Sequence, residues 1–291
     1  MKPAPFHYFA PSSIAAATAQ LSELAGEDAR VLAGGQTLIP AMALRLARPS
    51  HLIDINGIQE LNNLEVRGTA LHIGACVRHA AFHRPVVAGP LGALLLDVVR
   101  HVAHLPIRYR GTFCGSLANA DPAAEWCLVA ATLDARLTAC SARGEREIAA
   151  TEFFRGYLTT ALSSDELLIG AQLPCLSARE RFGFVEFSRR AGDFAMAMSL
   201  VVLQSEAGRL TRVRIGVGGV EVVPRRIAPA EQCLEGQLVR SENLERAAEA
   251  AAMAIEPAES EEELRVYKRS LVRAAVLRAL IKALDGQLRS H

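Results

Sequence analysis

RVLAGGQTLIPAMALRLARPSHLIDI, residues 30–55, decides the fold, because it passes from strand to helix and back to strand. A short apolar run enters a glycine pair, the next residues read as a helix that Pro49 stops, and HLIDI returns as a second strand. Upstream, Ser12 and Ser13 offer N-caps for a helix whose apolar residues recur every three or four positions until Gly26. Residues 1–56 are therefore expected to form a compact subdomain of alternating helices and short strands.

Residues 57–176 are expected to complete the first domain as a second subdomain. Apolar and polar residues alternate on both sides of Gly68 and Thr69, which predicts a hairpin. Further along we expect a buried helix that ends near Pro106, an irregular loop rich in small residues, a second hairpin and a closing strand, at residues 91–104, 107–126, 135–150 and 165–174.

Residues 177–291 are expected to form a separate C-terminal domain, in which strands come first and helices follow. Residues 182–220 are strand-rich with a turn at 206–209, which indicates a small antiparallel sheet. Two helices follow, at 243–255 and 262–284, and their place after the strands predicts an α+β layer with both helices on one face. On the second helix, the expected buried stripe is Leu264, Tyr267, Leu271, Ala274, Leu277, Ile281 and Leu284.

Composition excludes several classes of protein. With 291 residues, 51% of them hydrophobic, the chain is long enough for two domains with buried cores. The 32 basic and 31 acidic residues are dispersed, so neither a nucleic-acid footprint nor a polybasic membrane patch is visible. No secretory leader or membrane-spanning stretch is apparent, so we expect a cytoplasmic protein. The six cysteines have no paired spacing, which argues for free thiols and against an iron–sulfur or zinc site on this chain.

The first candidate site is the sequence Ala33-Gly34-Gly35-Gln36-Thr37, between a strand and a helix. Glycines permit a positive φ and remove Cβ atoms, so several backbone N–H groups can converge on an anion such as a diphosphate. A glycine pair in this position is also often an ordinary tight turn. The segment has neither the Gly-Lys-Ser/Thr of a Walker A loop nor the GxGxxG dinucleotide pattern.

The second candidate site is GTFCGSLANADP, residues 111–122, in which small and hydroxylated residues allow a ligand to approach the backbone closely. Several of its residues are apolar, so a partly buried loop is expected rather than a plain surface loop. Such a segment is suited to hold the other side of the same phosphates.

Three sequence blocks together resemble the FAD-binding medium subunit of the xanthine dehydrogenase and carbon monoxide dehydrogenase family. They are AGGQTLIPAMALRLARPSHLIDI, IRYRGTFCGSLANADPAAE and FVEFSRRAGDFAMA, and they stand in the family's order and spacing. The resemblance extends over essentially the whole chain. It implies an FAD domain folded like vanillyl-alcohol oxidase and p-cresol methylhydroxylase, in two α+β subdomains with the cofactor between them.

The resemblance also implies which residues would bind FAD. The first loop would wrap the diphosphate, the second would oppose it, Glu125 would hydrogen-bond the cofactor, and Leu168 would pack near the isoalloxazine ring. The full set comprises Leu32, Ala33, Gly34, Gly35, Gln36, Thr37, Leu38, Gly111, Thr112, Phe113, Cys114, Gly115, Ser116, Glu125 and Leu168. No catalytic acid, base, nucleophile or metal ligand is implied on this chain.

The second loop departs from the family pattern at Cys114, where the family's Gly-Thr-Ile-Gly-Gly has a glycine. If that position needs a positive φ, the cysteine costs about 1 kcal/mol or more of backbone strain. Looser FAD binding, or an adjusted loop, is the expected consequence.

Two groups of polar residues leave two interpretations open. Arg189, Arg190 and Asp193 either lie beside the flavin and its access channel or form a solvated strand end anchored by an ion pair. For His101 and His104, at a helix end, capping or a surface position is favoured over acid–base chemistry.

The function that the resemblance implies is electron transfer. Reducing equivalents from a molybdopterin cofactor on a large partner subunit would cross 2Fe–2S clusters on a small partner subunit, reach FAD here, and leave to NAD, oxygen or another acceptor. The expected assembly is a dimer of heterotrimers. Two alternatives remain open: a stand-alone FAD-dependent oxidoreductase, and a scaffold subunit that has lost FAD, which Cys114 would favour.

Overall fold

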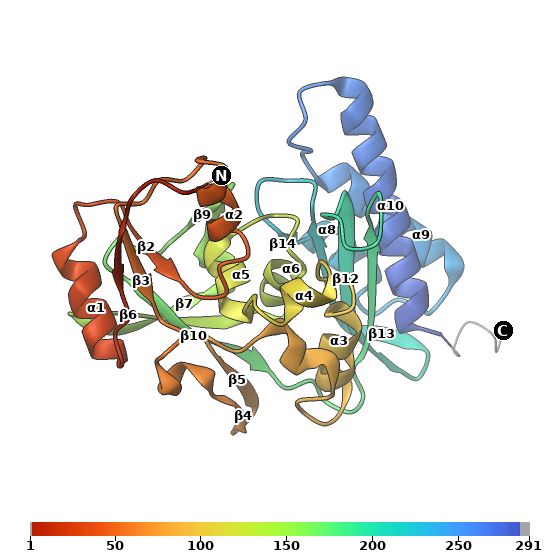
Figure 1. The fold of residues 1–291 in the computed structure, drawn as a ribbon. Helices are drawn as coiled ribbons and strands as arrows, with labels where there is room; N and C mark the ends of the chain where they lie inside the picture. The colour runs from red at the N-terminus through yellow and green to blue at the C-terminus, as the bar shows by residue number, and fades with distance from the viewer. Residues whose placement is uncertain (1, 286–291) are drawn as a thin grey trace.

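The computed structural model describes residues 2–285, so Met1 and residues 286–291 of the expected C-terminal domain lie outside it. Figure 1 shows an N-terminal part built on two small sheets beside a C-terminal part with one sheet and long helices. The expected α+β architecture is confirmed. No helix within residues 2–285 combines the length and the apolar character needed to cross a membrane.

A three-stranded parallel sheet with strand order β1-β3-β2 opens the chain. Its strands are β1 (His7–Phe9), β2 (Ala29–Leu32) and β3 (His51–Asp54), and its helices are α1 (Ile14–Glu23) and α2 (Leu38–Ala43). The predicted N-cap of α1 is confirmed, since the Ser13 hydroxyl accepts a hydrogen bond from the amide of Ala16 at 3.2 Å. The helix α2 ends before Pro49 is reached, because the chain turns into a left-handed conformation at Arg45 (φ 59°).

A five-stranded antiparallel sheet with order β4-β5-β10-β6-β7 forms the second layer. Both predicted hairpins and the closing strand are present, as β4 (Leu64–Arg67), β5 (Ala70–Gly74), β6 (Arg136–Ser141), β7 (Gly144–Ala149) and β10 (Leu167–Pro174). The small strands β8 (Phe154–Gly156) and β9 (Thr159–Thr160) pair separately, and short turns of helix lie at η1 (Gln59–Asn62), η2 (His79–His83) and α7 (Ala150–Phe153).

The expected loop at 107–126 is wrong, because most of it lies in helices. The buried helix before it is α3 (Pro90–Val98), and the segment itself contains the end of α4 (Leu105–Arg108), α5 (Phe113–Asn119) and the start of α6 (Glu125–Thr132). Tertiary packing holds α5 and α6 together: the Phe113 ring centroid lies 5.0 Å from that of Trp126 and 5.7 Å from that of Phe82.

The C-terminal sheet has the order β11-β12-β13-β14 and is covered on both faces. Its elements are β11 (Arg181–Phe187), β12 (Ala197–Glu206), β13 (Arg209–Gly218), β14 (Arg225–Arg226), α8 (Ala228–Leu234), α9 (Ser241–Ala254) and α10 (Glu262–Ala283). One face, with Val201 and Ile215, packs against α8 and α10. The opposite face, with Leu200 and Gly216, packs against α6 of the first domain. The predicted placement of this domain's helices on one face is confirmed.

The buried face of α10 differs from the predicted stripe. Its buried residues are Val272, Ala275, Val276, Ala279, Leu280 and Ala283, whereas Leu264, Tyr267 and Ile281 are 45%, 46% and 44% exposed. The reason is close backbone approach: Gly183 of β11 lies directly beneath Ala279, so the helix turns its alanines toward the sheet. Large apolar residues on the neighbouring face misled the spacing argument.

Candidate functional site

The first glycine segment connects β2 to α2 and lies at the surface, with residues 32–38 all partly or fully exposed. Gly35 has a φ of 70°, so the turn needs a glycine there. A Cβ on Gly34 would lie 2.5 Å from both the carbonyl oxygen of Arg110 and the Cα of Gly111. The two sequence-predicted segments are therefore brought together, with backbone against backbone.

The backbone amides of this first segment are free. Within residues 2–285, none of the five N–H groups from Gly34 to Leu38 donates a hydrogen bond, and the Gln36 side chain donates to the Gly34 carbonyl at 3.1 Å. Buried backbone amides are rarely left without an acceptor, whereas these amides lie at the surface, where a ligand can reach them. A run of free amides beside a positive-φ glycine is the arrangement that proteins use to bind phosphate oxygens.

Two side chains that the sequence interpretation missed hold this segment in place. Asn56 donates from Nδ2 to the carbonyl of Ala33 at 2.8 Å. Arg78 donates from Nη2 to the Asn56 Oδ1 at 2.5 Å and from Nη1 to the carbonyl of Arg110. This chain of bonds fixes the carbonyl side of the first segment and the start of the second, which leaves the amide side of the first segment open.

The second segment is the N-terminus of α5 rather than an open loop. Its Thr112 is the N-cap: the hydroxyl accepts from the Gly115 amide at 2.9 Å and the carbonyl accepts from the Ser116 amide at 3.1 Å. Phe113 donates its amide to the carbonyl of Val77 at 3.0 Å. Most of the N–H groups that were expected to oppose the diphosphate are therefore already bonded, and this segment's clearest contribution is to support the first.

The backbone strain expected at Cys114 is absent. The residue lies inside α5, it is not among the residues with a positive φ, and it is 2% exposed. Its Sγ donates toward the carbonyl of Ile73 at 3.6 Å, which points the thiol into the core and away from the first segment. Burial raises the pKa of this thiol well above its usual range, so it is not a nucleophile.

We expect Cys114→Gly, which restores the family's glycine, to lower the free energy of unfolding without raising the affinity for FAD. A glycine in a helix costs about 1 kcal/mol, and the lost buried thiol costs about 1 kcal/mol more. The midpoint of thermal or urea unfolding measures the stability, and titration with FAD measures the affinity for the cofactor. Cys114→Ala, which keeps the helix propensity, serves as the control, and tighter FAD binding by the glycine variant would contradict this account.

A buried histidine supports the second segment from below. His79 accepts a hydrogen bond at Nδ1 from the Trp126 indole N–H at 2.9 Å, and a Cβ on Gly111 would lie 2.6 Å from its Nε2. Burial, together with the nearby cations Arg108 and Arg78, lowers the pKa of His79 to about 4. The ring is therefore neutral at physiological pH and acts as a rigid support for the backbone at Gly111.

The two remaining sequence-predicted residues lie on elements next to α5. Glu125 begins α6, and burial raises the pKa of its carboxyl to about 7, an effect that Arg108 partly opposes. Leu168 lies in β10, which packs against α5, and it is 4% exposed beside an irregularity in the pairing with β6. Both residues therefore lie on elements that contact α5, and the Leu168 side chain is inside the core.

A cavity of about 350 Å³ opens where the two domains meet. The C-terminal end of α5 leads into it through Asp121, and its walls carry Tyr157 from the first domain and Phe194 from the second, which are 63% and 75% exposed. Its other lining residues are Pro122, Ala123, Gly219, Val220, Glu221, Val222, Ala258 and Glu259. Two exposed aromatic rings at the mouth of a cavity are suited to a flat ring system.

The charged segment before Phe194 packs against the first domain. Arg189, Arg190 and Asp193 are exposed, and no ion pair joins them to another residue in the described part of the chain. A Cβ on Gly192 would lie 2.6 Å from the Nδ1 of His104, which precedes α4. This favours the interpretation that the segment lies beside the site over that of an anchored strand end.

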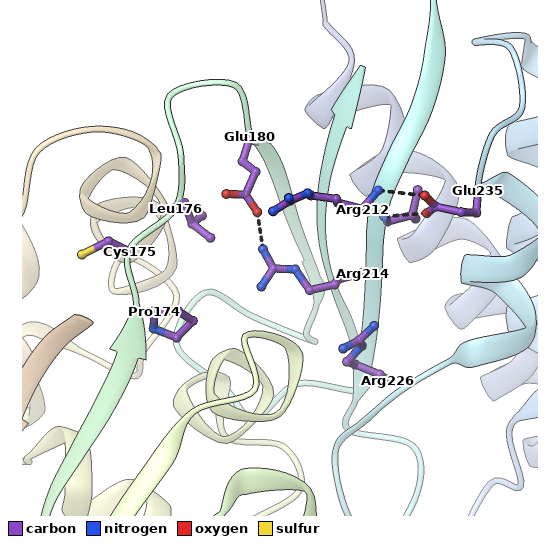
Figure 2. A pocket seen from close by; sticks show the side chains of 9 residues that line it. Pro174, Cys175, Leu176, Glu180, Arg212, Arg214, Arg226 and Glu235 are labelled. Atoms are coloured by element: carbon purple, nitrogen blue, oxygen red, sulfur yellow. Dashed lines mark hydrogen bonds and ion pairs between the residues drawn. The ribbon is translucent and has the colours of Figure 1, made fainter. Parts of the chain in front are cut away.

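A second cavity, of about 570 Å³, is a seam between the link that follows β10 and the strands β13 and β14 (Figure 2). Its arginines are largely neutralised: Arg214 donates to Glu180 at 2.5 Å, and Arg226 pairs with Glu231 at 2.8 Å. Glu235 accepts the backbone amides of Arg212 and the next residue at 3.0 and 3.1 Å. These interactions lie within the C-terminal domain and engage the side chains of Arg214 and Arg226, so neither arginine is free to bind a ligand.

Comparison with known proteins places these features in a family. Residues 4–176 match the FAD binding domain in molybdopterin dehydrogenase, and residues 182–283 match the CO dehydrogenase flavoprotein C-terminal domain. The chain is 37% identical to the nicotine 6-hydroxylase medium subunit of Paenarthrobacter nicotinovorans, over 97% of this chain and 99% of that one. Its fold is similar to that of carbon monoxide dehydrogenase from Hydrogenophaga pseudoflava, with a TM-score of 0.92, 34% identity, and 97% and 98% of the two chains covered. For quinoline 2-oxidoreductase from Pseudomonas putida 86 the TM-score is 0.90, with 34% identity and coverage of 98% and 99%.

Proposed function

Because this chain belongs to the family of FAD-binding medium subunits of molybdenum hydroxylases, we propose that it carries FAD and relays electrons from a partner subunit to an external acceptor. The observation that carries the proposal is the run of free amides from Gly34 to Leu38 beside the close backbone contact of Gly34 with Arg110. A Cβ would fill that contact, and the amides supply the donors that a diphosphate needs.

We assign positions to the parts of the cofactor from the elements that adjoin this segment. The diphosphate lies on the amides of the first segment, with Leu32, Ala33, Gln36 and Thr37 around it. The segment from Gly111 to Ser116 stands behind, with Phe113 and Cys114 turned into the core. Along α5 the chain runs toward Glu125 and toward the cavity that carries Tyr157 and Phe194, and the ring system of the flavin fits that cavity.

The residues of this chain bind and orient the cofactor and do not react with substrate. A bound flavin accepts electrons singly and passes them on in pairs. Asn56 and Arg78 fix the first segment, His79 supports the second, and the exposed rim of the cavity gives the flavin ring access to redox partners. This arrangement fits FAD held between the parts 1–56 and 57–176, with the domain from residue 177 forming one wall of the ring site.

The partners follow from the family. We propose a large subunit with the molybdopterin cofactor and a small subunit with 2Fe–2S clusters, assembled as a dimer of heterotrimers, with NAD or oxygen as the acceptor. Within residues 2–285, no three His, Cys, Asp or Glu side chains gather as a metal site. The alternative of a scaffold that has lost FAD rested on strain at Cys114, and the helical conformation of that residue removes its support.

The experiment is purification of the protein from its native host without added cofactor. We expect flavin absorption, FAD released on denaturation at one molecule per chain, and co-purifying subunits that contain molybdenum and iron. A colourless preparation that does not take up added FAD would refute the cofactor assignment. A yellow chain without partners that oxidises a small organic substrate by itself would refute the subunit assignment and support a stand-alone oxidoreductase.

A further inference from the structure

One oxygen of a largely buried carboxyl group lacks a hydrogen bond where the two domains meet. The side chain of Glu186, at the end of β11, is 2% exposed, and its Oε2 has no hydrogen-bond partner within residues 2–285. An ionised carboxylate in such a place is strongly disfavoured, because nothing replaces the hydrogen bonds of water. The group therefore needs either a proton or a donor that arrives during function.

A histidine connects this carboxyl with solvent. His101, which follows α3, has its Nδ1 3.9 Å from the Glu186 Oε2, which is beyond hydrogen-bond length. Its side chain is 36% exposed, and its ring edge rests on Phe184 with the centroids 5.0 Å apart. One side of the imidazole thus meets water while the other faces the buried carboxyl.

The charges around Glu186 favour its protonated form. Burial, together with the nearby carboxyl of Glu125 on α6, raises the pKa of the Glu186 carboxyl to about 8. Burial also lowers the pKa of His101, so that residue supplies no permanent cation. The other charged groups that face this pair are Asp97 on α3, Lys282 on α10, and Arg100 and Arg108 on either side of His101.

Three of these other charged groups, Asp97, Lys282 and Arg108, are already engaged. Lys282 donates to Asp97 at 2.8 Å and to the carbonyl of Phe184 at 3.1 Å. Arg108 donates to the carbonyls of Val102 and Ala103, at 2.5 and 3.0 Å. None of these cations reaches Glu186 as an ion-pair partner in the described residues, so the carboxyl stays available for proton exchange.

We propose that His101, Glu186 and Glu125 form a proton relay from solvent to the side of the flavin. The proposal rests on the proposed function, since a flavin that gains two electrons also takes up protons, whereas iron–sulfur clusters deliver electrons only. Glu125 is the inner member because it begins α6 two residues after Ala123 of the cavity wall, and His101 is the outer member because its side chain is 36% exposed.

The proton balance of the relay is closed. In this relay the Glu186 carboxylic acid would break its O–H bond and give the proton to the Glu125 carboxylate, which would supply it to a bound flavin as that group takes up electrons. Glu186, now a carboxylate, recovers a proton from water through the His101 ring. No oxidant or reductant is needed beyond the iron–sulfur donor of the partner subunit, which supplies the electrons.

The first test needs no flavin and measures unfolding of the whole chain against pH. A carboxyl whose pKa is raised in the folded state stabilises the protein at low pH, and that contribution is lost as pH rises from about 4.5 through about 8. We expect Glu186→Gln to remove this part of the slope, up to one proton per molecule. Glu147→Gln, at an exposed ion pair with Arg136, is the matched control and should leave the slope unchanged.

The second test follows reduction of the flavin in the protein purified with its subunits. We expect Glu186→Gln to slow proton-coupled reduction about 100-fold and to abolish its solvent deuterium effect. The infrared difference spectrum between oxidised and reduced protein should show a carboxylic-acid C=O band that disappears in the same variant. The control variant should match the wild type in both measurements.

The outcomes separate the two proposals. A wild-type protein without flavin refutes the proposed function and the relay with it, whatever the unfolding curves show. A wild-type protein with flavin whose reduction rate and C=O band are unchanged by Glu186→Gln refutes the relay alone. The same holds if the unfolding slope of Glu186→Gln equals that of the wild type, because Glu186 is then not protonated in the folded chain.

Discussion

Gly34→Ala is expected to weaken FAD binding about 100-fold while the chain still folds. The added Cβ would lie 2.5 Å from the backbone of Arg110 and Gly111, where no side chain can move aside. The two segments must therefore separate, at a cost of about 3 kcal/mol, which corresponds to about two orders of magnitude in the dissociation constant. Flavin content after gel filtration and fluorescence titration of the apoprotein with FAD measure the effect.

The control for this variant is Gly26→Ala, at the end of the first helix region. Gly26 has nothing within 4 Å of its ideal Cβ and no positive φ, so an alanine is accommodated without a shift. The control should bind FAD like the wild type. Retention of FAD by Gly34→Ala at wild-type affinity, in a protein with normal circular dichroism, would contradict the assignment of the first glycine segment as the diphosphate site.

The features that sequence could predict are those set by local interactions. The Ser13 cap, the hairpin at Gly68 and the strand that runs into Gly34 each depend on residues within a few positions of one another. A turn glycine and alternating side chains fix a hairpin without reference to the rest of the fold. The first glycine segment could be predicted for the same reason, because its strand, turn and helix are contiguous in the sequence.

The features that sequence missed depend on contacts between distant segments. The helix α5 has seven residues and begins in a glycine-rich stretch, so its stability comes from rings such as Trp126 that pack on it rather than from helix propensity. Arg78 and Asn56 lie 22 residues apart, and no spacing pattern links them. The sequence predicted backbone strain at Cys114 because it did not predict the helix α5. The conformation of Cys114 is set by that helix, which depends on tertiary packing.

The C-terminal domain also contains a glycine in close contact with the backbone of another element, Gly183 of β11. We expect Gly183→Ala to cause the largest loss of stability. The side-chain position of Gly183 in β11 faces the backbone of α10, where a Cβ would lie 2.9 Å from the carbonyl carbon of Ala279 and 3.0 Å from the amide of Ala283. Both neighbours are main chain in the C-terminal part of α10, so relief requires this end of the helix to move. We expect the free energy of unfolding to fall by about 3 kcal/mol, as measured by urea denaturation.

Gly156→Ala is the matched control, since Gly156 also lies in a strand but has open space around its ideal Cβ. It should change stability by less than about 1 kcal/mol. The displaced helix in Gly183→Ala also carries Lys282, whose bonds to Asp97 and Phe184 lie beside the Glu186 carboxyl. If helix packing positions that carboxyl, the variant should shift the pH dependence of unfolding as well as its midpoint. A normal unfolding curve for Gly183→Ala would show instead that α10 is not seated on β11 as the structure has it.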